Sequence, residues 1–167
     1  LLDYLSFEAA VTLADEGRPA AAYDESVLGQ TEKAIYGDPR IPLFGFYYPP
    51  VFQLLCAALA PLPFTLSYLL FMAATALAYI AVLRGTLRDA LLDAALISFP
   101  AVFYTVIVGQ NAFLTAALFG GALLLLDRRP AVAGILFGAM CYKPHFLVLV
   151  PVALIAGRHW KTLAAAA

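Results

Sequence analysis

A lysine, a proline and a histidine interrupt one of the most apolar parts of this sequence. Lys143, Pro144 and His145 lie inside AVAGILFGAMCYKPHFLVLVPVALIAG, residues 131–157. An ammonium group within such a run is costly and usually faces a polar cavity, where it can bind an anion. Two interpretations of Lys143 stay open: it binds a phosphate, or it extends its charged end to a membrane surface. His145 either donates a hydrogen bond to a phosphate or sugar hydroxyl, or satisfies a neighbouring carbonyl.

Two further short motifs carry side chains that suit a sugar ligand. Gln110 and Asn111 in GQN have amides that can bind hydroxyl groups, although Asn111 is also placed to cap the helix that follows. Tyr47 and Tyr48 in FYYPP precede a rigid proline pair. They belong to an aromatic belt at a membrane surface, or they stack on a sugar. Both interpretations stay open for each motif.

A carboxylate near the start of the chain is the candidate for acid–base chemistry. Asp3 directly follows an apolar pair, so it lies where a membrane span would leave the bilayer. A carboxylate there can take a proton from an acceptor hydroxyl as a general base. The alternative is a solvated charge beside the membrane. The catalytic interpretation gains support if Asp3, GQN and KPH converge on one cavity.

The composition shows what kind of protein must position these groups. Hydrophobic residues make up 63% of the chain and charged residues 13%, with a mean hydropathy of +0.88. Soluble domains carry about 45–50% apolar and about 25% charged residues. We therefore expect an integral membrane protein with the lipid bilayer as a partner and no nucleic-acid partner. Cys56 and Cys141 lie in apolar segments and indicate neither a disulfide framework nor a metal site.

The charges are unevenly distributed along the chain. Residues 1–42 hold eight carboxylates and three basic residues, whereas the later basic residues cluster in the short loops LRGTLRD, DRRP and GRHWK. Basic loops mark the cytoplasmic side of a membrane. We therefore expect residues 1–42 to form an extracytoplasmic loop and residues 43–167 a transmembrane helical domain. This places the protein in the cytoplasmic membrane, with its site on the extracytoplasmic side.

The apolar segments predict several helices. A span needs roughly 20 apolar residues, and Pro100 should kink the second predicted span in its middle. The last segment is too long for one span and should form two half-length helices that meet at Lys143. Residues 49–60 are short and are expected to re-enter the membrane or lie at its surface. The predicted spans and half-spans are 64–83, 90–108, 112–126 and 131–157.

The acidic loop is expected to contain short helices of its own. Tyr4, Phe7, Val11 and Ala14 recur at helical spacing, and Gly17 and Pro19 then end the pattern. Such a helix is expected to lie along the membrane surface with its apolar face down. A second short helix is expected at residues 27–35, before GDP turns the chain. The fold class is therefore an all-α polytopic transmembrane bundle, with an extracytoplasmic loop of short amphipathic helices.

The order and spacing of these motifs resemble glycosyltransferase family 87. DY, YPP, GQN and RRPAVAGILFGAMCYKP follow one another as in this family of polyprenol-phosphate-mannose-dependent alpha-1,2-mannosyltransferases with the GT-C fold. The resemblance implies inverting transfer of a hexose, mannose first, from a polyprenyl-phosphate sugar to a glycolipid or glycan acceptor. It also implies no metal or other cofactor. Asp3 would be the catalytic aspartate, and Lys143 would hold the lipid phosphate.

The chain also departs from the family pattern at both ends, and two other functions are compatible with a membrane protein of this kind. It opens without methionine and ends at WKTLAAAA, which is typical of another helix beginning, so we expect a fragment that lacks a first span and the later helices. A secondary transporter would show paired helix interruptions in two repeats, and only one strong interruption occurs here. A non-catalytic scaffold would tolerate replacement of Asp3 and Lys143. We expect the transferase.

Overall fold

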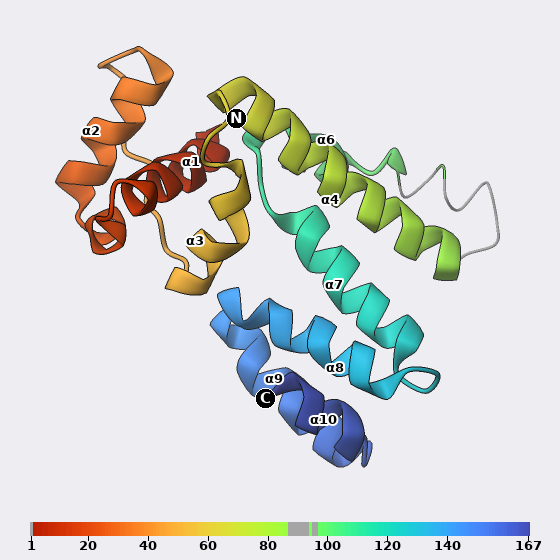
Figure 1. Cartoon of the computed structure of the whole chain (residues 1–167). Helices are drawn as coiled ribbons and strands as arrows, with labels where there is room; N and C mark the ends of the chain where they lie inside the picture. The colour runs from red at the N-terminus through yellow and green to blue at the C-terminus, as the bar shows by residue number, and fades with distance from the viewer. Residues whose placement is uncertain (1, 87–93, 95–96) are drawn as a thin grey trace. The chain divides into compact units, whose positions relative to one another are not determined.

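The described part of the chain is helical. The structure, a computed structural model, describes residues 2–86, 94 and 97–167 (Figure 1). These residues form α-helices and short 3-10 helices joined by turns and extended segments, and no β-strand occurs among them. This confirms the all-α part of the predicted fold class. The chain divides into two compact units: Leu1–Ala73 with Tyr104–Gln110 form unit 1, and Ala74–Phe103 with Asn111–Ala167 form unit 2.

Helix α1 (Leu2–Asp15) is the predicted N-terminal helix, and it forms the core of unit 1. Its end is set by Gly17, whose φ of 76° suits a residue without a Cβ atom. The expected position along a membrane surface is wrong, because side chains on all sides of α1 are buried within the protein. A second apolar stripe accompanies the predicted one. The buried apolar side chains are Tyr4, Leu5, Phe7, Ala9, Ala10, Val11 and Leu13.

Three short helices cover α1. They are η1 (Pro19–Tyr23), α2 (Glu25–Tyr36) and α3 (Pro50–Cys56). The predicted second helix is confirmed as α2, which begins where the Asp24 side chain accepts hydrogen bonds from the backbone N–H groups of Ser26 and Val27. It ends at Gly37, with φ of 80°, so the predicted GDP turn is also confirmed.

Helix α3 continues into η2 (Ala57–Leu59), and together they are short. The run Pro50–Leu59 is apolar but, at 1.5 Å per residue, reaches only about 15 Å, half the thickness of a bilayer core. This length agrees with the expectation that residues 49–60 do not span the membrane as one helix. Leu54, on this helix, exposes 76% of its surface.

One described helix is long and apolar enough to cross a membrane. Helix α4 (Phe64–Thr86) has 23 residues, a length of about 35 Å. It confirms the helix predicted at 64–83. Helix α7 (Ala112–Leu125) confirms the predicted helix at 112–126, but its 14 residues are shorter than a span. The described helices therefore establish one candidate span rather than a polytopic bundle.

The segment predicted at 90–108 differs from expectation. Pro100 does not kink a continuous helix; it is the first residue of α6 (Pro100–Val108), and a turn precedes it at Ser98 and Phe99. Proline is favoured at the first position of a helix, where its missing N–H would have no partner. Most of the earlier part of the prediction, residues 90–93 and 95–96, lies outside the described residues.

The interruption at Lys143 is confirmed. Helix α8 (Pro130–Gly138) tightens into η3 (Ala139–Tyr142), Lys143 is extended, and α9 (Pro144–Ala156) begins at the proline. Lys143 adopts φ −118° and ψ 93° because Pro144 disfavours a helical conformation in the residue before it. The sequence therefore breaks the apolar run at the residue that carries the ammonium group.

The last helix, α10 (Trp160–Ala166), packs against α8 in unit 2 (Figure 1). This confirms that WKTLAAAA begins another helix. Two glycines of α8, Gly134 and Gly138, face Ala165 and Ala166 so closely that added Cβ atoms would collide with α10. Small residues four apart allow helix backbones to approach in this way. The buried core beside this contact comprises Ala122, Ala133, Phe137, Met140 and Leu154.

Candidate active site

Asp3 and Gln110 are brought together in unit 1. Asp3 lies in the first turn of α1 and is partly buried. Its Oδ2 accepts a hydrogen bond from Gln110 Nε2, although more than a hundred residues separate the two in sequence. Burial raises the pKa of the Asp3 carboxyl. The predicted base and one predicted sugar ligand are therefore direct partners.

The turn before Gln110 explains why GQN contains a glycine. Gly109 has φ of 79°, and the N–H groups of Gly109 and Gln110 both donate to the Thr105 carbonyl, over 2.9 and 3.0 Å. A Cβ atom on Gly109 would lie 2.7 Å from Tyr4 Cβ. Only glycine therefore permits both the turn and the close approach of α1. The DY and GQN motifs are parts of one contact.

A second carboxylate of α1 is buried in a polar chain. The Tyr4 hydroxyl lies 2.5 Å from Ser67 Oγ, and Ser67 Oγ donates to Glu8 Oε2 over 2.8 Å. Burial raises the pKa of the Glu8 carboxyl, and the Ser67 hydrogen bond opposes that rise. Sequence reasoning missed Glu8. The available signal was its position one helical turn after Tyr4 within an apolar stretch.

The Lys143 ammonium group lies beside the Tyr142 ring in unit 2. Lys143 is partly buried, and its Nζ lies 6.0 Å from the centre of the Tyr142 ring. The ion pairs within the described residues join Arg18 to Glu16 and Arg40 to Asp38, so no carboxylate there neutralises Lys143. His145 is exposed, and its ring centre lies 4.5 Å from that of Phe146. Among the residues that the structure describes, the ammonium group therefore has no carboxylate counter-ion.

Asn111 connects the GQN motif to the YKP motif within unit 2. Its backbone carbonyl accepts from Thr115 Oγ1 over 3.1 Å, and that hydroxyl lies 2.9 Å from the Tyr142 hydroxyl. Asn111 occupies the capping position of α7, yet its side chain makes no capping hydrogen bond. The side chain is fully buried, and within the described ranges neither amide atom has a hydrogen-bond partner. Sequence reasoning missed Thr115 and Tyr142.

The two tyrosines of FYYPP have different environments. The Tyr48 ring stacks on Phe52 at 4.6 Å and meets Phe7 edge-on at 5.3 Å. Its carbonyl accepts a hydrogen bond from the Tyr23 hydroxyl. Tyr47 exposes 82% of its surface. Tyr48 is therefore engaged in the aromatic packing of unit 1, and Tyr47 has the ring that is open to a ligand.

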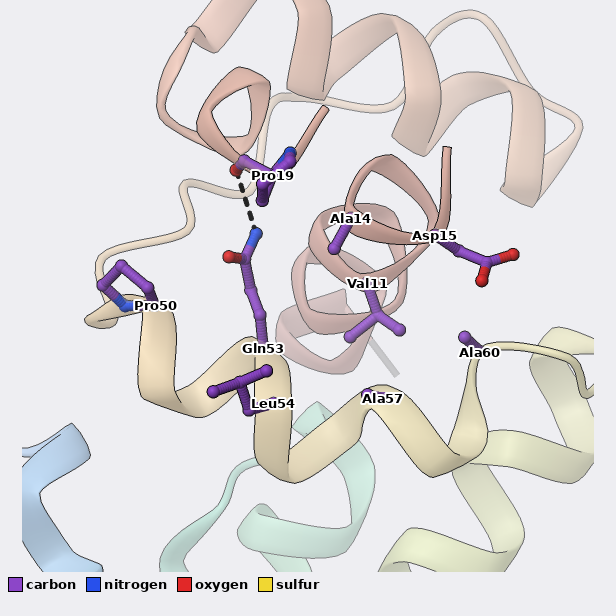
Figure 2. Close-up of a pocket in the computed structure, with 9 residues that line it drawn as sticks. All are labelled: Val11, Ala14, Asp15, Pro19, Pro50, Gln53, Leu54, Ala57 and Ala60. Atoms are coloured by element: carbon purple, nitrogen blue, oxygen red, sulfur yellow. Dashed lines mark hydrogen bonds between the residues drawn. The ribbon is translucent and has the colours of Figure 1, made fainter. Parts of the chain in front are cut away.

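A pocket of 430 Å³ lies beside α1, α3 and η2 in unit 1 (Figure 2). It contains none of the residues predicted for the site. Gln53 spans it, and its Nε2 donates to the carbonyls of Pro19 and Ala10 over 3.1 and 3.2 Å. These bonds tie α3 to α1. The other lining residues are Val11, Ala14, Asp15, Pro50, Leu54, Ala57 and Ala60.

Comparison with known families identifies the chain. The family model of glycosyltransferase family 87 matches residues 46–167. The chain belongs to glycosyltransferase family 87. The resemblance seen in the sequence is thus confirmed. The comparisons with curated proteins and with solved structures give no match.

Family 87 membership supports a glycosyltransferase, which acts on a sugar donor and an acceptor. It favours this activity over secondary transport or scaffolding. The matched range includes Tyr47, Gln110, Asn111 and Lys143, whereas Asp3 lies before it. The α4 span agrees with a membrane location for this family 87 protein.

Proposed function

We propose that this family 87 protein is a membrane enzyme that transfers a hexose, mannose first, from a polyprenyl-phosphate sugar to a glycolipid or glycan acceptor. The reaction takes place on the extracytoplasmic side of the cytoplasmic membrane. The acidic composition of residues 1–42 and the basic loops that follow support this orientation. In this proposal α4, α7 and the α8–α9 pair belong to a polytopic bundle.

The hydrogen bond from Gln110 to Asp3 is the observation that carries the proposal. It joins the carboxylate of the acidic loop to the GQN motif of the family-matched region. Burial raises the pKa of Asp3 and so makes it a better proton acceptor than a fully solvated aspartate. We assign Asp3 as the general base.

The proposed reaction is a single displacement with inversion at the sugar. Asp3 removes the proton from the acceptor hydroxyl, and the acceptor oxygen attacks the anomeric carbon. The bond from this carbon to the phosphate oxygen breaks, and its electron pair leaves on the phosphate. The products are the glycoside and polyprenyl phosphate, and Asp3 passes its proton to water. In this proposal the Lys143 ammonium group, rather than a metal ion, neutralises the charge that develops on the departing phosphate.

The remaining candidates bind the donor and acceptor in this proposal. Lys143 stabilises the negative charge of the departing phosphate, which its lack of a carboxylate partner within the described residues supports. His145, exposed beside it, donates to the same phosphate. The Asn111 amide binds sugar hydroxyls, and the exposed ring of Tyr47 stacks on the acceptor sugar.

Transfer of labelled mannose tests the proposal. The full-length protein in lipid is supplied with polyprenyl-phosphate mannose and a membrane glycolipid extract, and product is measured by chromatography. Asp3→Asn should lower kcat by about 10³-fold, within the roughly 10²- to 10⁴-fold that general acid–base catalysis contributes, whereas Asp15→Asn at the exposed end of α1 should not. Lys143→Ala should raise the KM for the donor, with Lys161→Ala as its matched control. Failure of wild type to transfer any polyprenyl-phosphate sugar would contradict the proposal.

A further inference from the structure

We propose that Gln110 is a positioning residue for the Asp3 base rather than a ligand of the sugar. This inference rests on the proposed function, in which Asp3 accepts the proton. The side-chain amide of Gln110 donates to Asp3 Oδ2. A donor on one carboxylate oxygen fixes the orientation of the group and leaves Oδ1 to receive the proton of the acceptor hydroxyl.

The backbone around Gln110 is held in place at several points. The N–H groups of Gly109 and Gln110 share the Thr105 carbonyl, over 2.9 and 3.0 Å. The Tyr68 hydroxyl of α4 donates to the Val106 carbonyl over 2.5 Å. The last turn of α6 is therefore fixed both to itself and to α4, so the Gln110 amide starts from a rigid position.

The opposite side of the contact is fixed as well. Tyr4, the neighbour of Asp3, occupies the space above Gly109, where a Cβ would lie 2.7 Å from Tyr4 Cβ and 3.2 Å from Tyr4 N. The Tyr4 ring packs edge-on against Tyr68 at 5.5 Å. Asp3 thus lies in the first turn of α1, which packs against the turn that carries Gln110. The backbone segments that carry Asp3 and Gln110 are therefore held against each other.

The charged and titratable groups around the contact determine how strongly the Gln110 amide stabilises the ionised form of Asp3. On α1 the Glu8 carboxylate accepts from Ser67, Tyr4 lies beside Asp3, and Asp15 is exposed at the far end. On α3 the buried Cys56 thiol lies near Tyr4 and Glu8. On α4 the facing group is Tyr68, and α6 carries Tyr104, which is exposed. A neutral donor to the ionised carboxylate stabilises the charged form and keeps Asp3 unprotonated at the working pH.

The pH dependence of transfer separates positioning from sugar binding. In full-length protein in lipid, Gln110→Met keeps the length of the side chain and removes the donor. We expect kcat to fall about 10- to 100-fold, and the acidic limb of kcat against pH to move up by about one unit, since a hydrogen bond to the charged form is lost. The KM of donor and acceptor should change less than about threefold. Gln30→Met, on the exposed face of α2, is the matched control.

The other outcomes overturn the inference in distinguishable ways. A tenfold rise in the KM of the donor or acceptor, with the acidic limb of kcat at the wild-type pH, would indicate that Gln110 binds substrate. Loss of activity in Asp3→Asn together with a wild-type profile in Gln110→Met would reject the positioning role and keep the proposed function. Inactive wild type would reject both. If Gln110→Met does not fold, the isosteric variant Gln110→Glu takes its place. The new carboxylate opposes ionisation of Asp3 and should move the acidic limb of kcat against pH upward. An acidic limb at the wild-type pH would reject the inference.

Discussion

The Ser67 hydroxyl donates a 2.8 Å hydrogen bond to the buried carboxylate of Glu8 and thereby fastens the first turn of α4 to α1. The same hydroxyl lies 2.5 Å from the Tyr4 hydroxyl. Ser67→Ala removes the partner of both groups. We expect a loss of about 1–3 kcal/mol in the free energy of unfolding, because each would remain buried without its hydrogen bond. Thermal unfolding of the protein in lipid nanodiscs measures this loss.

Glu8→Gln provides the companion variant. A glutamine keeps an acceptor for the Ser67 hydroxyl and removes the carboxyl that burial makes hard to ionise. We expect its unfolding temperature to equal or exceed that of wild type near neutral pH. If Glu8→Gln is as destabilised as Ser67→Ala, the charge of Glu8 contributes to the fold beyond this hydrogen bond.

Glu32 should give unit 1 a stability that depends on pH. It is buried, its Oε2 accepts from the Phe44 N–H over 2.9 Å, and Oε1 has no partner within the part of the chain that is described. Burial raises its pKa to about 6 from 4.5. The folded state therefore binds the proton more tightly than the unfolded state, and this contribution to stability is full below pH 4.5 and lost as pH rises through 6.

Comparison with Glu32→Gln isolates that contribution. The amide retains an acceptor for the Phe44 N–H and does not titrate. Above pH 7 we expect the variant to be more stable than wild type by about 1 kcal/mol, a value reduced for solvent screening. Near pH 4.5 this advantage should vanish. Unfolding temperatures across this range measure it, and a constant difference between the two proteins would contradict the assignment.

The contact between α8 and α10 should not tolerate the methyl group that a Gly→Ala substitution adds. A Cβ on Gly134 would collide with the Thr162 carbonyl and lie 2.6 Å from Ala165 Cβ. We expect Gly134→Ala to cost about 1–3 kcal/mol through overpacking. Gly121 of α7 is the matched control, since its added Cβ would meet Leu136 at an ordinary 3.4 Å. Gly121→Ala should be neutral or stabilising in thermal unfolding; equal losses for both glycines would argue against a tight contact at Gly134.

Asn111 should show opposite effects on stability and on activity. Both atoms of its buried amide lack a partner in the described residues, and such a group costs free energy until a ligand binds it. We expect Asn111→Leu, which is similar in size, to raise the unfolding temperature and to lower kcat/KM for mannose transfer about 10- to 100-fold. A lower unfolding temperature would instead indicate that the amide is satisfied within the protein, as by a buried water.

Local chemistry made several elements predictable from the sequence. Proline acts on its immediate neighbours, so Pro144 was sufficient to predict the extended Lys143 between two helices. Gly37 likewise ended α2 through its own backbone conformation. Periodicity predicted that Tyr4, Phe7 and Val11 share one apolar face, and in the structure this face is buried within the protein. It did not reveal that Leu5 and Leu13 are buried too, because burial on other faces depends on which helices cover them.

The partners within the candidate site depended on tertiary structure. Nothing in the local sequence of Gln110 indicates that its amide meets Asp3, since the two are remote in the chain. The packing of Tyr48 against Phe7 and Phe52 is equally non-local. Pro100 misled the prediction in a different way: the same residue that kinks a helix also starts one, and the sequence alone does not separate these roles.

The close fit of α10 on α8 also sets an order of assembly. While the ribosome makes the chain, the glycine face of α8 is complete before α9 and α10 have been synthesised. Until α10 arrives, that face lacks the helix that packs against its glycines. The return of the chain through α9 therefore decides when this face is covered, and α8 reaches its close fit only after α10 has been made.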